Sequence, residues 1–325
     1  MGLISNGRWV KRATVLAVAV ALAGAASFAL PGAAQAVRMG GTAPVSFDRS
    51  FKCDLLERLP QPPRLVIFGG SRAQRFEPAV VQRLTGLSAF NFAAQNSRPE
   101  DVYAMARFMF WRAPEVKLHC FWALQATTLS DSPLHPGLLA ERRLSQFLPD
   151  YLLKTQPTVT AETSSGRELQ TTDVYGPRGD LVHNGYDLRL ERGVSFETTL
   201  AGYLAKMVPR AEEGSPYAQT RAKQYFERTL GLFNLHGVTP VLVIMPYHPT
   251  VLAAFRAVGW QTRADAFKAY LESLRAAYRF ELLDYSELAS FGGTPDGFYD
   301  GAHVQRVNAR RILAQAVADA PAAFR

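Results

Sequence analysis

The sequence has little cysteine: only Cys53 and Cys120 occur among its 325 residues. Two cysteines are too few for a small scaffold held by disulfides, although one bridge could join them in an oxidising compartment. Cys120 lies in the apolar run VKLHCFWAL, which favours a buried thiol instead. The sequence also lacks the cysteine and histidine spacing of zinc sites. We therefore expect no metal site and no cofactor.

A block of basic residues interleaved with aromatics, which nucleic-acid-binding proteins carry, is also missing. The formal net charge of +8 comes from 36 basic and 28 acidic side chains spread along the chain. We therefore expect no nucleic-acid partner, since an anionic glycan or a membrane surface suits a dispersed positive charge better. Hydrophobic residues make up 48% of the sequence, enough for a full core, which excludes disorder as the main state.

Residues 1–36 have the layout of a targeting segment. Three basic residues precede the uncharged run 13–36, which contains a proline and ends in Ala-Gln-Ala. This layout is typical of a cleaved secretory signal peptide. The alternative is an N-terminal membrane anchor formed by residues 13–30, because about 18 uncharged residues lie near the lower limit for crossing a bilayer. In both cases we expect the folded part to be exported, in the periplasm or another extracytoplasmic space.

Strands and helices alternate after a linker, 37–63, in which we expect one short helix. Five strands separated by helices predict an α/β fold with a doubly wound, mostly parallel sheet. The polar segment at about 130–195 interrupts the alternation, and its turn signals predict an insertion with a hairpin within one domain, 64–325. The expected strands are 64–68, 88–93, 116–124, 238–245 and 279–286, and the expected helices are 77–86, 99–113, 215–237, 261–278 and 304–320.

Ser71 follows the first expected strand and two glycines, in the stretch RLVIFGGSRAQRFEP. The glycines permit a tight turn that holds the next residue at the carboxyl edge of the sheet. Open α/β sheets keep their ligand sites at that edge. On this stretch alone, Ser71 is either a helix N-cap or a nucleophile.

Asp300 and His303 stand three residues apart in GFYDGAHVQRVNARRI, just before the last expected helix. A bend there can put the carboxylate beside one imidazole nitrogen and leave the other nitrogen free. This is the base and acid of a serine-hydrolase triad, and the alternative is a structural role such as helix capping. Together with a serine on a strand-to-helix turn, the pair predicts a triad of Ser71, His303 and Asp300.

With these motifs the chain resembles the SGNH/GDSL hydrolase superfamily, because GGSR and DGAH look like its first and last sequence blocks. More narrowly, VIFGGSRAQRFEP, AFNFAAQNSRPEDVYAMARF and FYDGAHVQRVNARRI are similar to exported relatives that acylate cell-envelope polysaccharides, of the alginate acetylation and teichoic-acid D-alanylation types. The resemblance covers residues 64–125 and 238–316. It implies a flavodoxin-like α/β/α sandwich, with Ser71 as nucleophile, His303 as general base and Asp300 as orienting acid.

The chain departs from this superfamily at the oxyanion hole. Such enzymes use the backbone N–H of the nucleophile, the N–H of a glycine after the second strand and an asparagine side chain after the third. Here Asn96 holds the glycine position, and WALQATT replaces the Gly-x-Asn-Asp motif. Asn91, Asn96 and Gln125 are candidate donors, although Asn91 could equally hold its own backbone. One missing donor costs roughly 2.7 to 4 kcal/mol of transition-state stabilisation, which predicts slow or specialised chemistry.

Two more residues are candidates for substrate binding. Arg72 could hold a carboxylate or a sugar oxygen through its fork of donors, or it could form a structural ion pair across the sheet edge. His248 follows the fourth expected strand. It either lines an acyl or sugar pocket or is an ordinary loop residue.

The leading hypothesis is an exported serine esterase or O-acyltransferase. It would act on an acylated cell-envelope or secreted polysaccharide, with an envelope export or acylation complex as partner. The alternative is a catalytically weak glycan-binding or assembly protein that keeps the fold without the oxyanion hole. A flavodoxin-like binding module is less favoured, because the glycines before Ser71 lack the spacing of a dinucleotide or P-loop motif.

Overall fold

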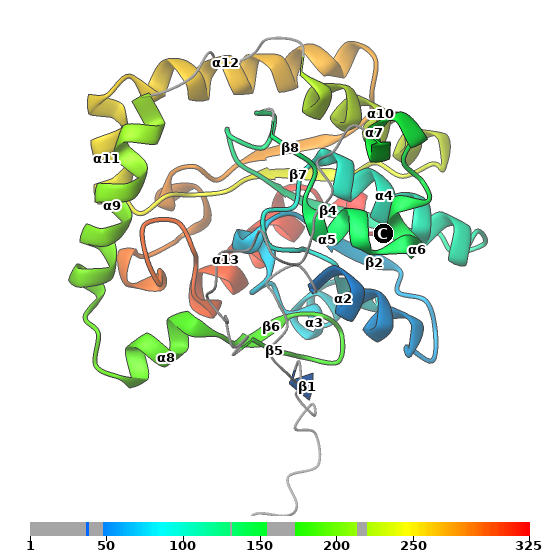
Figure 1. Ribbon diagram of the computed structural model, residues 1–325, viewed down its shortest axis with the longest axis horizontal. Coiled ribbons are helices and arrows are strands. Elements are labelled where there is room, and N and C mark those ends of the chain that lie inside the picture. The colour runs from blue at the N-terminus through cyan, green and yellow to red at the C-terminus, as the bar shows by residue number, and fades with distance from the viewer. Residues whose placement is uncertain (1–36, 39–47, 131, 155–172, 213–219) are drawn as a thin grey trace, which may run out of the picture. The chain divides into compact units, whose positions relative to one another are not determined.

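The computed structural model describes residues 37–38, 48–130, 132–154, 173–212 and 220–325 (Figure 1). The segment for which we expect a signal peptide or an anchor lies outside these residues. Within the part of the chain that the structure describes, no helix is both long and apolar enough to cross a bilayer.

The centre of the fold is a sheet of five parallel strands in the order β3-β2-β4-β7-β8. Counted along the chain, this is the order 2-1-3-4-5 of flavodoxin-like folds. The predicted α/β class with a parallel sheet is confirmed. The strands are β2 (Leu65–Phe68), β3 (Ala89–Asn91), β4 (His119–Leu124), β7 (Val241–Ile244) and β8 (Glu281–Asp284).

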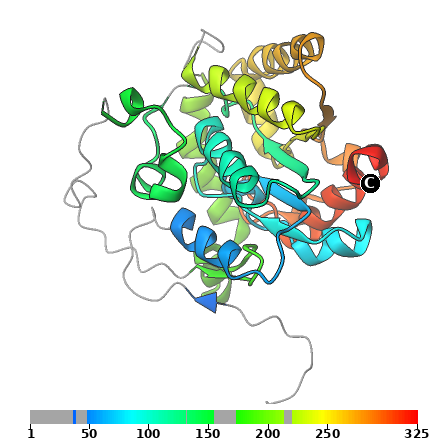
Figure 2. The same cartoon turned by 90° about the vertical axis from the view of Figure 1, so that its right-hand side faces the viewer.

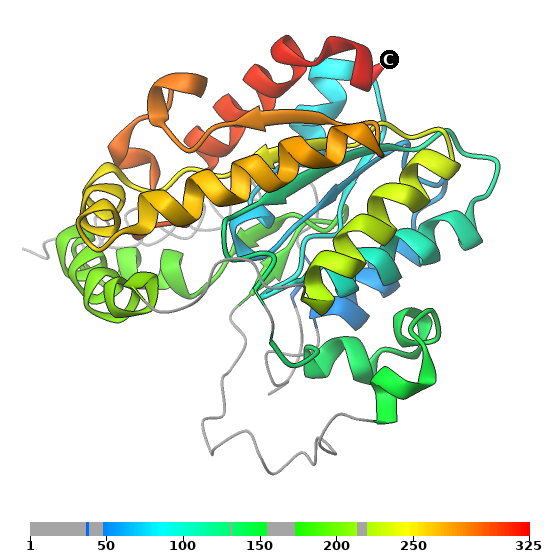
Figure 3. The ribbon, with the colours of Figure 1, turned by 90° about the horizontal axis from the view of Figure 1, so that it is seen from above.

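Helices cover both faces of the sheet (Figures 2 and 3). Along β2, Leu65 and Ile67 pack into one core cluster, and Val66 and Phe68 pack into the other. Central parallel strands buried on both faces are nearly all apolar, which is why their sequences are continuous hydrophobic runs. The first face is covered by α3 (Pro78–Thr85) and α13 (Arg306–Asp319), and the second by α2 (Asp48–Glu57), α4 (Pro99–Arg112) and α10 (Arg221–Leu235).

The helix α2, in the segment expected to be a linker, is fixed to the domain by buried charges. Arg49 donates a 2.7 Å hydrogen bond from Nε to Oδ1 of Asp101 in α4. Both side chains are almost completely buried. Asp48 accepts a 2.6 Å bond from the backbone N–H of Gln95. These contacts fix the loop after β3, which contributes to the site described below.

The two cysteines are both buried and free. Burial raises the pKa of both thiols, so neither is poised to react. The sequence-based expectation that Cys120 is a buried thiol is confirmed.

The insertion contains the expected hairpin, formed by β5 (Val174–Tyr175) and β6 (Leu181–His183). Strand β1 (Val37–Arg38) pairs with β5 and completes a small antiparallel sheet. The hairpin lies against the main sheet, where the backbone carbonyl of Arg178 accepts a 2.8 Å hydrogen bond from the N–H of Asn91. The insertion also contains helices that the sequence analysis did not predict: α5 (Pro136–Ala140), α6 (Arg142–Ser145), α7 (Asp150–Lys154) and α8 (Gly185–Glu191).

The sequence Asn184-Gly185 is typical of a turn, but Asn184 begins a helix here. Its side chain accepts a 3.0 Å hydrogen bond from the N–H of Tyr186, and the carboxylate of Asp187 accepts one from the N–H of Asn184. This reciprocal arrangement is a capping box.

Two further helices were not expected: α9 (Phe196–Glu212) and α11 (Pro249–Ala257). They pack against each other at one side of the sheet (Figure 1). The expected helix at 261–278 is present as α12 (Trp260–Ser273), which continues into one turn of 3-10 helix.

Candidate functional site

Ser71 lies directly after β2, at the start of a short 3-10 helix, Ser71–Ala73. The turn depends on Gly69, whose φ is 143° and where a Cβ atom would approach Ala73 and Ala123 to 3.0 Å. No side chain caps this helix, so the N-cap alternative for Ser71 is wrong. Its hydroxyl lies 2.9 Å from Nε2 of His303 instead.

Asp300 and His303 lie on a bend before α13. Oδ1 of Asp300 accepts 2.8 Å bonds from the N–H groups of Ala302 and His303, which fixes the carboxylate inside the bend. Its Oδ2 lies 2.9 Å from Nδ1 of His303. Gln305 is the N-cap residue of α13, with no side-chain cap, so Asp300 does not cap that helix.

The three side chains therefore form a continuous chain of hydrogen bonds from Ser71 through His303 to Asp300. Burial of Asp300 opposes its ionisation, but hydrogen bonds and the charge of His303 outweigh it and hold its pKa well below the usual range. Because a carboxylate only accepts, Nδ1 of His303 carries the proton that faces it. Nε2 is then free to accept the proton of Ser71.

Tyr186 is a fourth member of this network, and the sequence analysis did not identify it. Its hydroxyl donates a 2.8 Å hydrogen bond to Oδ2 of Asp300 and lies 3.0 Å from Nδ1 of His303. Burial, with the nearby charge of Asp300, raises the pKa of Tyr186 well above its usual value, so the phenol remains a donor. No local motif indicated this role, because Tyr186 belongs to the insertion.

The helix α8 is held in place by Arg75, which follows the 3-10 helix of Ser71. Arg75 forms a salt bridge with Asp187 and a 2.9 Å hydrogen bond with Oδ1 of Asn184. Tyr299 donates a 2.8 Å bond to the other oxygen of Asp187, and its ring stacks on that of Tyr186. The insertion is thereby attached to both the serine turn and the histidine bend.

Asn91 is not available as an oxyanion donor. Its amide nitrogen donates to three backbone carbonyls, at 2.8 Å for Phe76, 2.9 Å for Ala73 and 3.2 Å for Gln74. Its amide oxygen accepts a bond from the N–H of Ala93. The alternative that Asn91 holds the local backbone is therefore confirmed.

Asn96 has a positive φ of 52°, the left-handed region that glycine and asparagine tolerate best. It can therefore keep the backbone conformation that a glycine would adopt at this position. Within the described residues, the backbone N–H groups of Asn96 and Ser71 have no hydrogen-bond partner. Both residues line the same cavity.

Gln125 follows β4 and lines that cavity too. Its Oε1 lies 3.3 Å from Nη1 of Arg72. Since arginine only donates, the amide is oriented with its oxygen toward Arg72 and its NH₂ group remains as a donor. No hydrogen bond from that NH₂ group is found among the described residues.

Arg72 is buried, and the ion-pair alternative for it is wrong: no carboxylate of the described residues lies within 4.0 Å of its guanidinium. It donates a 3.0 Å bond to the carbonyl of Ala302, just before His303, and another to the carbonyl of Pro246. Its guanidinium also lies over the ring of Tyr247. Arg72 therefore joins the serine turn, the end of β7 and the histidine bend.

His248 caps α11, with Nδ1 accepting a 3.2 Å bond from the N–H of Thr250. Its ring packs against Phe196 and Phe298. His248 is not among the described residues that line the cavity beside Ser71, and neither is His303, so the pocket role of His248 stays a prediction.

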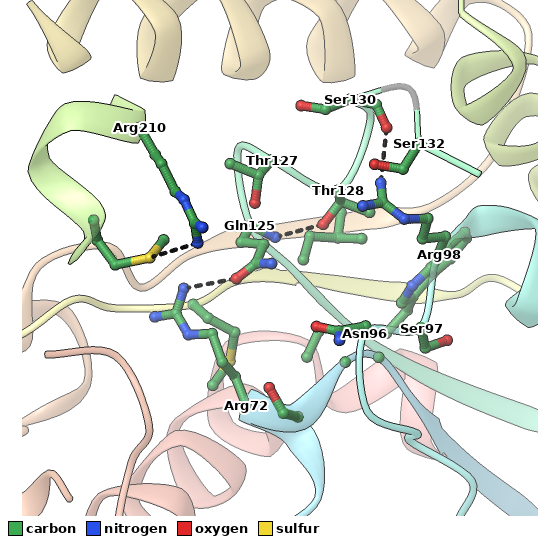
Figure 4. A pocket seen from close by; sticks show the side chains of 18 of the residues that line it. Arg72, Asn96, Ser97, Arg98, Gln125, Thr127, Thr128, Ser130, Ser132 and Arg210 are labelled. Atoms are coloured by element: carbon green, nitrogen blue, oxygen red, sulfur yellow. Dashed lines mark hydrogen bonds between the residues drawn. The ribbon is translucent and has the colours of Figure 1, made fainter. Parts of the chain in front are cut away.

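The cavity beside Ser71 has a volume of about 810 Å³ and opens over the carboxyl ends of β2, β3 and β4 (Figure 4). This volume is within the range of about 300 to 1,000 Å³ that is usual for small-ligand sites. Nine of its twenty described lining residues carry a hydroxyl or an amide, among them Asn96, Gln125, Thr127 and Thr128. The described residues contain no cluster of metal-ligating side chains.

Comparisons with known proteins were made for the whole chain. No family model matches it, and a search of the curated proteins finds no significant match. Chemically, the arrangement combines an oriented serine, an imidazole base and a polar cavity. These are the requirements for nucleophilic attack on an ester.

Proposed function

We infer that this protein is an SGNH-type serine esterase or O-acyltransferase of an acylated cell-envelope or secreted polysaccharide. The inference depends above all on the hydrogen-bonded chain of Ser71, His303 and Asp300, with distances of 2.9 Å on both sides of the imidazole. Nucleophile, base and orienting acid within hydrogen-bond reach are the geometric signature of an activated serine.

The reaction proceeds through an acyl-enzyme. Nε2 of His303 removes the proton of Ser71 as Oγ attacks the ester carbonyl, and Asp300 stabilises the imidazolium that forms. His303 then protonates the departing sugar oxygen. Water, or the hydroxyl of a second sugar, gives its proton to His303 as it attacks the acyl-enzyme and restores Ser71. Water as the second nucleophile makes the enzyme an esterase, and a sugar makes it a transferase.

Three donors near Ser71 are suited to stabilising the oxyanion. The backbone N–H groups of Ser71 and Asn96 have no partner in the described part of the chain, and Gln125 keeps its NH₂ group as a donor. Donors that are already in position when charge develops supply a large share of enzymatic rate enhancement. Asn96 and Gln125 would thus replace the glycine and asparagine of the resembled superfamily.

The cavity favours a polar substrate. Its hydroxyl, amide and guanidinium groups suit sugar hydroxyls, whereas a long fatty acyl chain would leave them without hydrogen bonds. A small acyl group on a glycan fits this requirement. The segment 1–36 would export the enzyme or anchor it beside an envelope acylation complex.

The second candidate is a catalytically weak glycan-binding or assembly protein, which the replaced oxyanion-hole motifs favour. Intact-mass spectrometry after fluorophosphonate treatment separates the two. We expect an adduct on the wild type, mapped to Ser71, and none on Ser71→Ala or His303→Ala. A wild type that stays unlabelled would contradict the esterase proposal and favour the binding protein.

A further inference from the structure

The loop between β3 and α4 is held from one side by the first residues of α2. Asp48 accepts a 2.6 Å hydrogen bond from the N–H of Gln95, and Nη2 of Arg49 donates a 3.1 Å bond to the carbonyl of the same residue. The side chains of Asp48 and Arg49 are almost completely buried. Both polar groups of the Gln95 backbone are therefore bound by adjacent residues of one helix.

The carbonyl of Gln95 and the N–H of Asn96 belong to one peptide group. The described residues contain no cis peptide bond, so this group is planar and trans, and its C=O and N–H point in nearly opposite directions. Asn96 lines the cavity beside Ser71 (Figure 4), and no hydrogen bond from its N–H is found in the described part of the chain. The bond from Arg49 to the carbonyl thus sets the direction of a proposed oxyanion donor.

Arg49 is itself fixed by two carboxylates. Its Nε lies 2.7 Å from Oδ1 of Asp101 in α4, and its Nη1 lies 3.0 Å from Oδ1 of Asp48. A guanidinium is a rigid, planar fork, so these two bonds determine where Nη2 points. A lysine ammonium lacks the fork that reaches all three acceptors at once.

Lys52, one turn further along α2, holds the preceding part of the loop. Its ammonium donates to the carbonyl of Ala93 and lies 5.1 Å from the ring centre of Tyr175 in the hairpin. The side chain is fully buried, and no carboxylate of the described residues lies within 4.0 Å of its nitrogen. A cation buried without a paired carboxylate lowers stability. Residues that break a rule of stability in this way are typical of functional sites.

We propose that Arg49 and Lys52 are positioning residues of the candidate active site, which hold the loop after β3 so that the N–H of Asn96 faces the oxyanion. The proposal rests on the proposed function, since it requires attack of Ser71 on an ester carbonyl. Neither cation lines the cavity, so both act through the backbone of the loop. A donor that is already in place when the charge develops needs no reorganisation during the reaction.

The first test is the kinetics of fluorophosphonate labelling of Arg49→Lys, which keeps the charge but releases the carbonyl of Gln95. We expect the labelling rate at saturating probe to fall about tenfold, while the half-saturating concentration stays within about twofold. This split follows because an oxyanion donor acts in the transition state. Arg143→Lys is the matched control and should change neither value by more than about twofold. Arg143 also binds carboxylates and a carbonyl of α2, that of Ser50.

The second test uses the charge of Lys52, because burial lowers its pKa to about 7. The ionisable groups that face it from α2 and from the insertion are Asp48, Arg49, Asp173, Tyr175 and Asp180. A hydrogen bond from a charged donor is roughly twice as strong as one from a neutral donor. We therefore expect the wild type to be labelled about three- to tenfold faster than Lys52→Met at pH 6, and about twofold faster or less at pH 9.

The ratio of the two rates removes the titration of groups that both proteins share. Lys223→Met is the matched control, since Lys223 is also buried, with its ammonium 4.5 Å from the ring centre of Tyr270. The ratio for this control should not change with pH. A ratio for Lys52→Met that is constant from pH 6 to pH 9 would reduce Lys52 to a structural role and contradict its part in the proposal.

Two measurements are independent of Ser71. In hydrogen–deuterium exchange, the amides of residues 93–98 should exchange faster in Arg49→Lys and Lys52→Met than in the two controls. In urea denaturation, the unfolding free energy of the wild type relative to that of Lys52→Met should rise between about pH 7 and pH 10. In that window an unfolded lysine keeps its proton while Lys52 in the folded state has lost it.

Unchanged exchange of residues 93–98 in both variants, or labelling kinetics equal to those of the controls, would overturn the proposal. If Arg49→Lys does not fold, Lys52→Met decides alone. A wild type that stays unlabelled contradicts the proposed function, and with it the oxyanion role. Hydrogen exchange then still reports whether α2 holds the loop, so the two failures are distinguishable.

Discussion

The phenol of Tyr186 donates a 2.8 Å hydrogen bond to the carboxylate of Asp300. Through this bond, a helix of the insertion reaches the acid that orients His303. Asp300 now accepts from the imidazole, from two backbone N–H groups and from a phenol, so the donors hold both of its oxygens in place. The insertion therefore belongs to the candidate site and does not merely cover it.

We expect Tyr186→Phe to slow fluorophosphonate labelling of Ser71 by about three- to tenfold. A hydrogen bond to a charged group contributes roughly 1.5 to 3 kcal/mol, and only part of this free energy raises the activation barrier for labelling. Tyr299→Phe is the matched control, since its phenol also binds a carboxylate, that of Asp187, in the same ring stack. Equal labelling rates in the two variants would show that Tyr186 has only a structural role.

Two variants of Asn96 distinguish whether its backbone N–H or its side chain would donate to the oxyanion. Asn96→Gly keeps both the N–H and the positive φ, so we expect labelling within about twofold of the wild type. Asn96→Val should lose at least about tenfold, because a β-branched residue disfavours the left-handed conformation. If Asn96→Gly loses about a hundredfold, as for one removed donor, the side chain is the donor instead.

Arg72→Lys should destabilise the protein and slow labelling together. A lysine ammonium is compact and cannot reach both backbone carbonyls that Arg72 joins, so one would remain buried without a partner at a cost of about 1 to 3 kcal/mol. Urea denaturation and the labelling rate measure the two effects. Arg83→Lys, on the exposed surface of α3, is the control. Unchanged stability in Arg72→Lys would contradict a joining role.

Asp300 should contribute a pH-dependent part of the stability. Its pKa in the folded state lies below the unfolded value of about 3.9. In the window between the two pKa values the unfolded state binds more protons. Its stabilising contribution is therefore fully present above about pH 4 and is lost as the pH falls through the folded-state pKa.

We therefore expect the difference in unfolding free energy between the wild type and Asp300→Asn to narrow as the pH falls below about 4. Urea denaturation from pH 3 to pH 7 measures it, with Asp296→Asn, an exposed aspartate nearby, as the control. A difference that stays constant with pH would show that Asp300 is not held ionised by its partners.

The sequence predicted the sheet well because its central strands are short apolar runs buried on both faces. It also predicted that Ser71 would lie near the pair Asp300 and His303, because both stand after a strand, at the carboxyl edge of a parallel sheet. Their chemical roles remain a proposal. The helices α9 and α11 were missed, although the sequence His248-Pro249 is a readable helix start: a polar cap followed by a proline in the first turn.

Other features could not be predicted, for physical reasons. Two partners of Arg72 are backbone carbonyls, which every residue carries, so its sequence context did not indicate them. Tyr186 is more than 100 residues from Asp300 in the sequence, in a segment without a clear hydrophobic periodicity. The positive φ of Asn96 depends on the loop that Asp48 and its neighbours hold in place.

The separation between Ser71 and His303 has a consequence for when the site first exists. The two residues are 232 positions apart, and His303 lies on the bend before the last long helix. A chain that is still being synthesised can complete the turn around Ser71 while the imidazole has not yet been made. If Ser71 is the nucleophile proposed above, it stays unactivated until α13 docks on the sheet, and a nascent or C-terminally truncated chain carries the serine without its reactivity.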